Sequence, residues 1–234
     1  MGEPKIAVVT GANRGIGLAT ARRLAELGVE VWLTSRGSEG QRVAASLARE
    51  GLKVAFHPLD VTDAPQGAAL ARALRDRVGH LDILVNNAGV FHDDRTGPGV
   101  LALDPELLDA TLAVNLKGPL LVTRALAPLL RRAPAARVVN VSSHLGQMAG
   151  QDTRFPAYRL SKVALNALTR QLAAALPPPI LVNAVSPGWV ASDMGGFDAP
   201  RTPDQGAQSV VWAALLGADG PTGGFFYDGE AVDF

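Results

Sequence analysis

The sequence predicts an α/β fold built on a doubly wound parallel sheet of about seven strands with helices on both faces. Short β-branched runs alternate with helical stretches along the whole chain of 234 residues. Most of the strand segments are apolar on both faces, as strands buried in a parallel sheet must be. Glycines and polar residues follow directly after the strands, at the edge where open parallel sheets bind ligands.

The expected elements follow one another with short connections. The strands are expected at residues 5–10, 30–34, 53–57, 83–85, 137–141, 181–185 and 225–227. The helices are expected from the first glycine-rich turn to about residue 27, and at residues 41–50, 64–78, 105–130, 157–175 and 203–216. The long stretch 105–130 is expected to be interrupted around Lys117-Gly118-Pro119. We expect the strand order 3-2-1-4-5-6-7 and, since no linker or repeat divides the chain, one domain over residues 1–234.

Composition narrows the classes of partner and chemistry. The 22 basic residues balance the 22 acidic ones, which argues against a nucleic-acid or acidic-membrane partner. The absence of cysteine excludes disulfides, thiolate catalysis and cysteine-based zinc sites, and the four histidines lack metal-ligand spacing, so no metal is expected. The start of the chain does not look like a signal peptide, and no apolar run reaches membrane-spanning length. We therefore expect a cytoplasmic protein.

A glycine-rich turn follows the first strand. Gly11 permits a tight turn, Gly15 lets a phosphate approach the backbone, and Gly17 allows close packing of helix and strand. The helix that follows offers free N–H groups and a positive dipole end to a pyrophosphate. This pattern predicts a dinucleotide site that includes the intervening Asn13, Arg14 and Ile16, although an ordinary glycine-rich turn remains the alternative.

The end of the second strand indicates which dinucleotide is bound. Sites for NAD place an Asp or Glu there to accept a hydrogen bond from the ribose 2′-hydroxyl. This chain has Thr34-Ser35-Arg36-Gly37 instead, with no carboxylate before Glu39. Arg36, together with Arg14, would form charge-assisted hydrogen bonds with a 2′-phosphate, which predicts NADPH. Alternatively, both are solvated surface charges.

Two further polar segments follow strands. Asp60-Val61 comes after the third strand, where the carboxylate could accept from an adenine amino group or simply cap a helix. Asn86-Asn87-Ala88-Gly89 comes after the fourth strand, where asparagine side chains can bridge neighbouring strands and small residues leave room for a ligand. A plain turn is the alternative reading of this second segment. Both segments are counted in the expected cofactor site, with Asn87, Ala88 and Gly89 as its members.

Polar residues in apolar surroundings mark the expected chemical centre. Asn115 lies inside a long apolar helix, where a buried amide needs partners, and it either fixes a local kink or holds an ordered water. Ser142 and Ser143 follow the fifth strand, as a helix cap or as hydroxyls that bond a substrate oxygen. His144 beside them suggests a Ser–His nucleophile, but adjacent residues rarely point the right way and no G-x-S-x-G turn is present.

Tyr158 and Lys162 are four residues apart on one expected helix, so their side chains project side by side. A neighbouring ammonium group is expected to lower the phenol pKa toward the range of acid–base catalysis. On its own this pair also arises by chance on many helices.

Taken together, these motifs resemble the short-chain dehydrogenase/reductase family. The matching segments occur in the family's order over nearly the whole chain, namely Thr10-Gly11-Ala12-Asn13-Arg14-Gly15-Ile16-Gly17, Asn86-Asn87-Ala88-Gly89, Asn115, Ser143, Tyr158 to Lys162, and Pro187-Gly188. The segment from Pro187 to Met194 and the tail 202–226 are most similar to NADPH-dependent carbonyl reductases. Two departures are a missing long insertion before the tyrosine and a Ser143–Tyr158 spacing about two residues longer than in compact members.

The resemblance implies a Rossmann-type fold and a role for each matching residue. Tyr158 would protonate the carbonyl oxygen as hydride arrives, and Lys162 would lower the tyrosine pKa and hold the nicotinamide ribose. Ser143 would position the substrate oxygen, and Asn115 would hold a water in the proton relay. The remaining implied contacts are Pro187, Gly188, Val190 and Ser192 with the cofactor and Trp189 with the substrate. A non-catalytic NADP(H)-binding sensor on the same fold is the alternative function.

The resemblance also bears on substrate and assembly. We expect a small, fairly apolar carbonyl substrate, because the segments expected around the site supply Phe91, Leu145, Phe155, Trp189, Met194 and Phe197. We expect a homo-oligomer, because in compact members the helices that hold Asn115 and Tyr158 pair between subunits. Here the apolar contact would come from Leu112, Leu116, Leu120, Leu168 and Leu172.

Overall fold

The computed structural model describes residues 4–93 and 99–234, and its centre is one sheet in the order β3-β2-β1-β4-β5-β6-β7-β8. The strands are β1 (Ile6–Val9), β2 (Glu30–Ser35), β3 (Val54–Pro58), β4 (Ile83–Asn86), β5 (Arg137–Val141), β6 (Leu181–Ser186), β7 (Phe225–Tyr227) and β8 (Glu230–Ala231). Every pairing is parallel except the last, between β7 and β8. The predicted class and the predicted order of the first seven strands are confirmed.

The eighth strand was not predicted, although the sequence contains its signal. Asp228 and Gly229 both have positive φ, 47° and 87°, which is the conformation of the tight turn that joins antiparallel strands. The Asp-Gly pair is typical of such a turn, but the two-residue strand after it is too short to have a pattern of its own.

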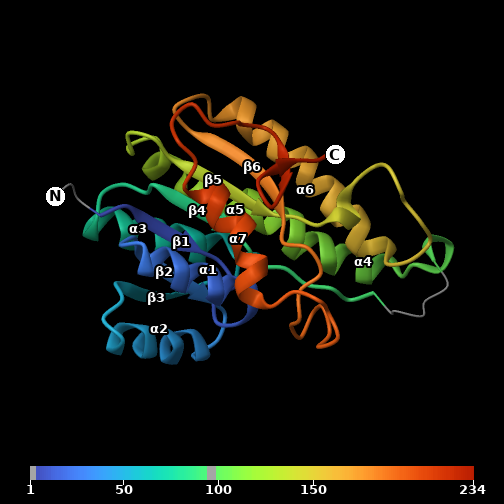
Figure 1. Cartoon of the computed structure of the whole chain (residues 1–234), viewed down its shortest axis with the longest axis horizontal. Helices are drawn as coiled ribbons and strands as arrows, with labels where there is room; N and C mark the ends of the chain where they lie inside the picture. The colour runs from blue at the N-terminus through green and yellow to red at the C-terminus, as the bar shows by residue number, and fades with distance from the viewer. Residues whose placement is uncertain (1–3, 94–98) are drawn as a thin grey trace.

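Helices cover both faces of the sheet (Figure 1). On one face lie α1 (Gly15–Glu26), α2 (Glu39–Arg49) and α7 (Pro203–Ala214), with α1 packed against α7. On the other lie α3 (Ala64–Arg77), α4 (Pro105–Leu112), α5 (Gly118–Leu130) and α6 (Pro156–Ala175). Two short 3₁₀ turns, η1 (Val100–Ala102) and η3 (His144–Gly146), were not predicted, since three residues carry no periodicity.

The two faces of the sheet carry separate hydrophobic cores. Along β1, Ile6 and Val8 pack into the core under α3 and α5, while Ala7 and Val9 pack into the core under α1 and α7. The same alternation recurs in β4, where Leu84 faces one core and Val85 the other. Both faces of these strands are therefore buried, which explains why the strand segments are apolar throughout.

The helical stretch 105–130 is irregular close to where the sequence predicted an interruption, although the chain stays helical throughout. Gly118 and Pro119 open α5, and Pro119 has no N–H to donate to the preceding turn. The irregularity lies just before them, as a π-helical turn η2 (Ala113–Lys117) that joins α4 to α5 and contains Asn115. Single π turns inside α-helices are frequent at functional sites.

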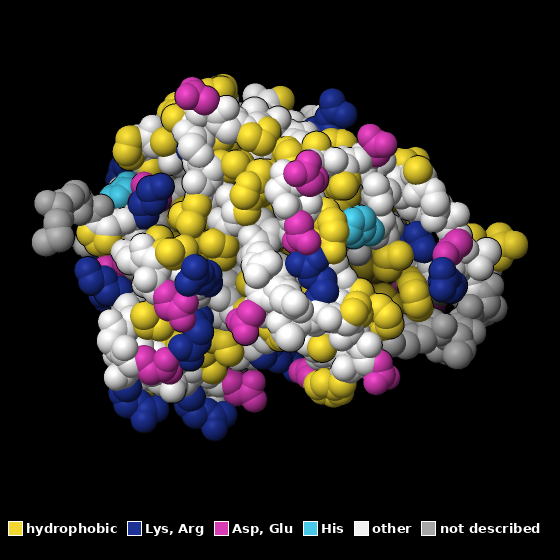
Figure 2. Space-filling model, viewed as in Figure 1, with side chains coloured by type: hydrophobic (Ala, Val, Ile, Leu, Met, Phe, Trp, Pro, Cys, Tyr) yellow, Lys and Arg dark blue, Asp and Glu magenta, His cyan; other side chains and the backbone are white. Residues whose placement is uncertain are grey.

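The surface carries mixed charge. Figure 2 shows basic and acidic side chains interspersed on the face it presents. Among the described residues, no helix is both long and apolar enough to cross a membrane.

Candidate active site

A cavity of about 360 Å³ lies at the carboxyl ends of the central strands. Most of the residues predicted for the cofactor and the chemistry line it, namely Gly11, Asn13, Arg14, Gly15, Ile16, Gly17, Arg36, Asp60, Val61, Asn87, Ala88, Gly89, Tyr158, Lys162, Pro187 and Ser192. The predicted cofactor and catalytic residues that are not part of its lining are Asn115, Ser143, Gly188, Trp189 and Val190. Of the other apolar residues expected around the substrate, Met194 lines the cavity, whereas Phe91, Leu145, Phe155 and Phe197 do not. The fold thus brings segments from six strand ends, β1 to β6, to one place, as parallel strands require.

The glycine-rich turn has two positions that only glycine fits easily. Gly11 and Gly15 have φ of +62° and +55°, in the left-handed region. A Cβ on Gly11 would lie 2.9 Å from Ala88 Cα, whereas a Cβ on Gly15 would meet only Ser192 Cβ, 3.9 Å away. Gly15 therefore leaves open space at the cavity wall, which suits close approach of a phosphate.

Gly17 is needed for a different reason from the predicted packing of helix on strand. A Cβ there would lie 2.4 Å from Asn87 Nδ2 and 2.6 Å from the Gly11 carbonyl oxygen. Asn87 Nδ2 crosses this space to donate to the carbonyl oxygens of Thr10 and Gly11, at 2.8 and 3.2 Å. Gly17 makes room for the side chain that ties the turn to the end of β4.

We expect Gly17→Ala to lower the free energy of unfolding by about 1–3 kcal/mol, the usual range for overpacking a close-packed site. Denaturant unfolding measures the change. Gly217→Ala is the matched control, because no atom of residues 4–93 or 99–234 lies within 4 Å of its added Cβ. Equal stability of the two variants would contradict this reading of the turn.

The asparagines after β4 bridge neighbouring strands, as predicted. Asn87 reaches β1 through the bonds just described, and the Thr10 hydroxyl accepts from the N–H groups of Asn87 and Ala88, at 2.9 and 3.0 Å. Asn86 Nδ2 donates to Asn140 Oδ1 on β5 at 2.9 Å and to Thr123 on α5 at 3.0 Å. These buried bonds hold three strand ends at the floor of the site.

The residues around the turn fit the phosphates of a dinucleotide. Helix α1 begins with Arg14 at its N-cap, which forms no side-chain cap, and its first turn contains no acidic residue. The free N–H groups and the helix dipole there favour an anion. Arg14 forms an ion pair with Asp193 across the mouth of the cavity, and Arg36 lines the same cavity.

A second feature also fits a ligand in this cavity. Ser142 is 2% exposed and lines the cavity, yet its hydroxyl oxygen has no hydrogen-bond partner among the described residues. Buried polar groups rarely lack a partner, so this oxygen suits a ligand atom or water. The site expected from the sequence contained Ser143 and not its neighbour Ser142.

Asp60 is not the helix cap that the sequence offered as an alternative. The cap of α3 is Asp63, which accepts from the Gln66 N–H. Burial favours the neutral acid at Asp60, but hydrogen bonds from the Thr62 N–H and hydroxyl outweigh it and hold the pKa of Asp60 below its ordinary value. The carboxylate lines the cavity and keeps an acceptor oxygen, Oδ2, outside those two bonds.

Tyr158 and Lys162 lie side by side on α6, as their spacing predicted. Lys162 Nζ lies 5.4 Å from the centroid of the Tyr158 ring and donates to the Val141 carbonyl oxygen at 2.8 Å. Both side chains are buried, at 8% and 4% exposure. The sheet end at β5 thus fixes the lysine against the tyrosine.

The predicted lowering of the tyrosine pKa is wrong for the protein alone. Burial raises the pKa of Tyr158 to about 12, and a hydrogen bond from Ser143 opposes this only in part. Burial also lowers the pKa of Lys162 to about 8, because an apolar environment disfavours either charge. The phenol is therefore protonated at neutral pH, which is the state a proton donor needs.

The side chain of Asn115 forms hydrogen bonds that link two segments of the chain. Its Oδ1 accepts from the Val90 N–H at 2.8 Å, and its Nδ2 donates to the Val90 carbonyl at 2.9 Å and to Ser161 Oγ at 3.0 Å. The side chain therefore joins the segment after β4 to α6. Its predicted role in holding a relay water stays a prediction.

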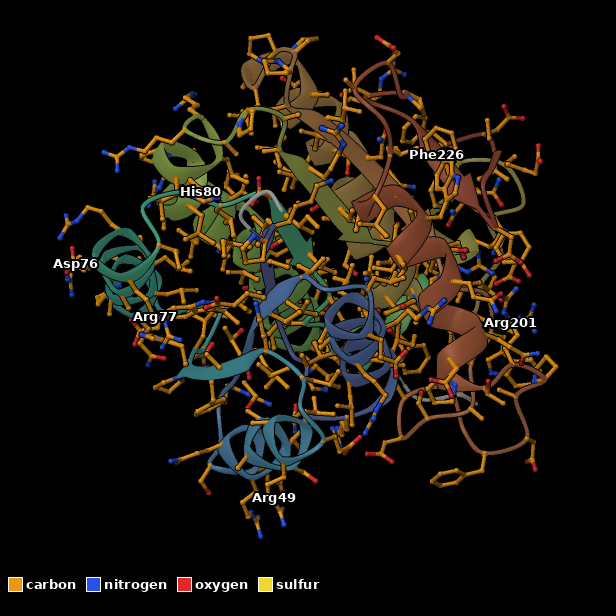
Figure 3. All side chains as sticks on the ribbon, turned by 60° about the vertical axis from the view of Figure 1, so that its left-hand side comes forward. Arg49, Asp76, Arg77, His80, Arg201 and Phe226 are labelled. Atoms are coloured by element: carbon orange, nitrogen blue, oxygen red, sulfur yellow. The ribbon has the colours of Figure 1, made fainter. Side chains whose placement is uncertain are left out.

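The predicted residues in the loop after β6 only partly line the cavity. Pro187 and Ser192 line the cavity, whereas Val190 is 4% exposed under α7, where Gly206 makes room for it. Gly188, with φ of +76°, lies against Arg201, which Figure 3 labels beside α7. Trp189 is 57% exposed, and its indole N–H donates to the Gly195 carbonyl within the loop.

The described side chains do not form a metal centre or a Ser143–His144 nucleophile at this site. Within the described parts of the chain, no group of three or more His, Asp and Glu residues could hold a metal ion. His144 Nδ1 bonds Ser186 Oγ at 2.8 Å, and its ring packs on Tyr227. Ser143 Oγ instead accepts from the Leu145 N–H, so the histidine is paired with another serine.

Comparison with known proteins identifies the family. Residues 5–201 match the family model for short chain dehydrogenases, so the chain belongs to this family and is an oxidoreductase. Among its relatives is carbonyl reductase [NADPH] 1 of Sus scrofa, 34% identical over 279 positions that cover 98% of this chain and 94% of that protein. That alignment is longer than the 234 residues of this chain, so the relative carries insertions that this chain lacks.

Solved structures agree with this assignment. Salutaridine reductase from Papaver somniferum is 32% identical with a TM-score of 0.84, over 96% of this chain and 99% of that one. A short chain dehydrogenase from Shigella flexneri complexed with NADP is 27% identical with a TM-score of 0.87, over 96% of each chain.

Proposed function

We propose that this protein is an NADPH-dependent carbonyl reductase in which Tyr158 is the general acid. The observation that carries the proposal is the buried Tyr158 phenol, which lines the cavity together with Lys162 and is hydrogen-bonded by Ser143 from outside the lining. Similarity to carbonyl reductase [NADPH] 1 and salutaridine reductase supports it. A non-catalytic sensor would have no need of this arrangement.

NADPH, when bound, supplies the hydride that reduces the carbonyl carbon. As negative charge develops on the carbonyl oxygen, the Tyr158 hydroxyl donates its proton to that oxygen, and the Ser143 hydroxyl supplies a second hydrogen bond. The phenolate that remains is stabilised by the protonated Lys162 amine beside the ring. Asn115 ties Val90, which lines the cavity, to Ser161 on the helix that carries Tyr158 and Lys162.

The proposed cofactor is NADPH in preference to NADH. The second strand ends at Ser35 with Arg36 after it, and both line the cavity without a carboxylate from β2. Arg14 lines the same cavity and is paired with Asp193 through one of its nitrogens, so its remaining donors and those of Arg36 are proposed to bind a 2′-phosphate. A relative named for its use of NADPH and a neighbour complexed with NADP support the same choice.

The proposed substrate is a small, fairly apolar carbonyl compound. Phe91 packs on both Tyr158 and Phe155, with ring centroids 5.0 and 5.1 Å apart, which makes the surroundings of the phenol aromatic. Trp189 and Phe197 are exposed in the loop after β6, at 57% and 82%. These phenylalanine and tryptophan rings lie outside the lining of the cavity, to which Met194 of the same loop does belong, so they offer apolar surface next to it and not its wall. Apolar surface near the reacting group suits an apolar ligand.

A panel of aldehydes, ketones and quinones tests the proposal through NADPH oxidation followed by absorbance. We expect turnover with apolar and aromatic carbonyls and little with small charged ones. No turnover with any carbonyl compound would contradict the function, while turnover confined to charged substrates would contradict only the substrate class.

The pH dependence of kcat/KM for NADPH is expected to follow the loss of the proton from the Lys162 amine. Burial lowers the pKa of Lys162 to about 8, so the amine carries its proton below that pH and loses it above. Because the protonated amine stabilises the phenolate, kcat/KM should fall as pH rises through about 8. In Lys162→Arg the guanidinium stays charged, and the fall should move to higher pH. A profile that is flat for the wild type, or unchanged in this variant, would contradict the assignment.

We also propose that two copies associate through the helices that hold Asn115 and Tyr158. Leu120 and Leu160 are exposed there, at 41% and 45%. Light scattering at micromolar concentration should give a dimer mass or more, and Leu120→Glu should shift it toward the monomer. A monomer mass for the wild type would rule the association out.

A further inference from the structure

The helix that holds Tyr158 has no cap of its own. Helix α6 begins at Pro156, and the residue before it, Phe155, provides no side-chain cap. Phe155 has φ of +56°, in the left-handed region that a bulky side chain seldom adopts. Such a conformation persists only where surrounding contacts hold it.

Asp93 supplies the missing cap from a distant part of the chain. Its Oδ1 accepts from the Ala157 N–H at 2.9 Å and its Oδ2 from the Tyr158 N–H at 2.8 Å. Pro156 has no N–H, and the next N–H, of Arg159, already bonds the Phe155 carbonyl at 2.9 Å. The two carboxylate oxygens of Asp93 therefore take both N–H groups that the first turn leaves free.

The segment that ends at Asp93 also touches the tyrosine ring. Phe91 lies with its ring centroid 5.0 Å from that of Tyr158 and 5.1 Å from that of Phe155. Val90, one residue earlier, lines the cavity and is held by Asn115 through both its N–H and its carbonyl. One short segment therefore connects the cavity wall to the ring and the main chain of Tyr158.

We infer that Asp93 is a positioning residue that sets the place of the Tyr158 hydroxyl at the substrate carbonyl. The inference rests on the proposed function and adds to it a residue that does not line the cavity. A carboxylate suits this position because it offers two acceptor oxygens and its charge is favourable at a helix N-terminus. Displacement of a reacting group by about 1 Å lowers turnover by as much as ~10²-fold.

The first test is the effect of Asp93→Ala on turnover and on binding separately. We expect kcat to fall by ~10- to 10²-fold, because the tyrosine is displaced. The dissociation constant of NADPH, measured by fluorescence without substrate, should change by less than about twofold, because Asp93 does not line the cavity. A kcat within about twofold of the wild type would overturn the inference.

Two further variants separate positioning from stability. Asp93→Asn retains an acceptor oxygen for one N–H but turns an N–H₂ group toward the other, so its kcat should lie between those of wild type and Asp93→Ala. If Asp93→Ala does not fold, Asp93→Asn is measured in its place. Asp104→Ala removes a cap of the same residue type from α4, where Asp104 accepts from the Glu106 N–H at 2.9 Å. It should lower the melting temperature and leave kcat unchanged; an equal loss of kcat in Asp104→Ala would overturn the inference.

A double-mutant cycle with Tyr158→Phe decides whether Asp93 acts through the tyrosine. In that background Asp93→Ala should have no further effect on residual turnover, because the group it positions is gone. The same fold-loss in both backgrounds would overturn the inference. Wild-type turnover is measured first, and its absence would refute the proposed function itself, an outcome distinct from a failed cycle.

Discussion

Tyr158→Phe is expected to lower kcat for carbonyl reduction by at least ~10²-fold, the lower end of what a general acid contributes. The change removes only the hydroxyl, and the Phe91 and Lys162 contacts with the ring remain available. The dissociation constant of NADPH should stay close to that of the wild type. Stopped-flow measurement of a single turnover checks the chemical step directly.

The second tyrosine of the chain provides a matched control, because Tyr158 and Tyr227 are its two tyrosines. Tyr227 accepts a hydrogen bond from Arg201 with its hydroxyl, lies against His144 and does not line the cavity. Tyr227→Phe makes the same chemical change and should retain turnover. Unchanged turnover in Tyr158→Phe would contradict the role of Tyr158 as the general acid, whatever the result for Tyr227→Phe.

Arg36→Asp is expected to lower kcat/KM for NADPH by ~10- to 10²-fold and to leave that for NADH unchanged or improved. A hydrogen bond to a charged group contributes roughly 1.5–3 kcal/mol, and the variant also brings a negative charge toward the 2′-phosphate. The new carboxylate stands where NAD-binding sites place one, so it can accept from a ribose 2′-hydroxyl. Both constants, and both dissociation constants, should be measured at one ionic strength because such contacts are screened by salt.

Arg49→Asp is the control for charge alone. Arg49 is exposed at the far end of α2 from Arg36, where Figure 3 labels it, and it does not line the cavity. This variant should discriminate between the cofactors as the wild type does. Equal use of NADH and NADPH by the wild type would contradict the NADPH assignment. It would not contradict carbonyl reduction, which rests on Tyr158 and Lys162.

Local sequence determined the fold class and the order of the motifs. Strands β1 to β7 follow from short apolar runs, because both faces of a buried parallel strand must be apolar. The places of the glycine-rich turn, Arg36, Asp60 and Asn87 follow from one rule, that parallel strands end at a common edge. The pairing of Tyr158 with Lys162 follows from helical spacing alone.

Tertiary structure decided the features that depend on burial and on long-range contact. The direction of the Tyr158 pKa could not be derived from its neighbour four residues away, because the packing of α6 on the sheet removes both groups from water. Gly17 leaves space for the side chain of Asn87, which is 70 residues away in the chain, so the local sequence does not indicate this requirement. The cap of α6 by Asp93 joins positions 64 and 65 residues apart. No local pattern records such a bond, because it depends on where the fold brings a carboxylate to a helix that lacks a cap of its own.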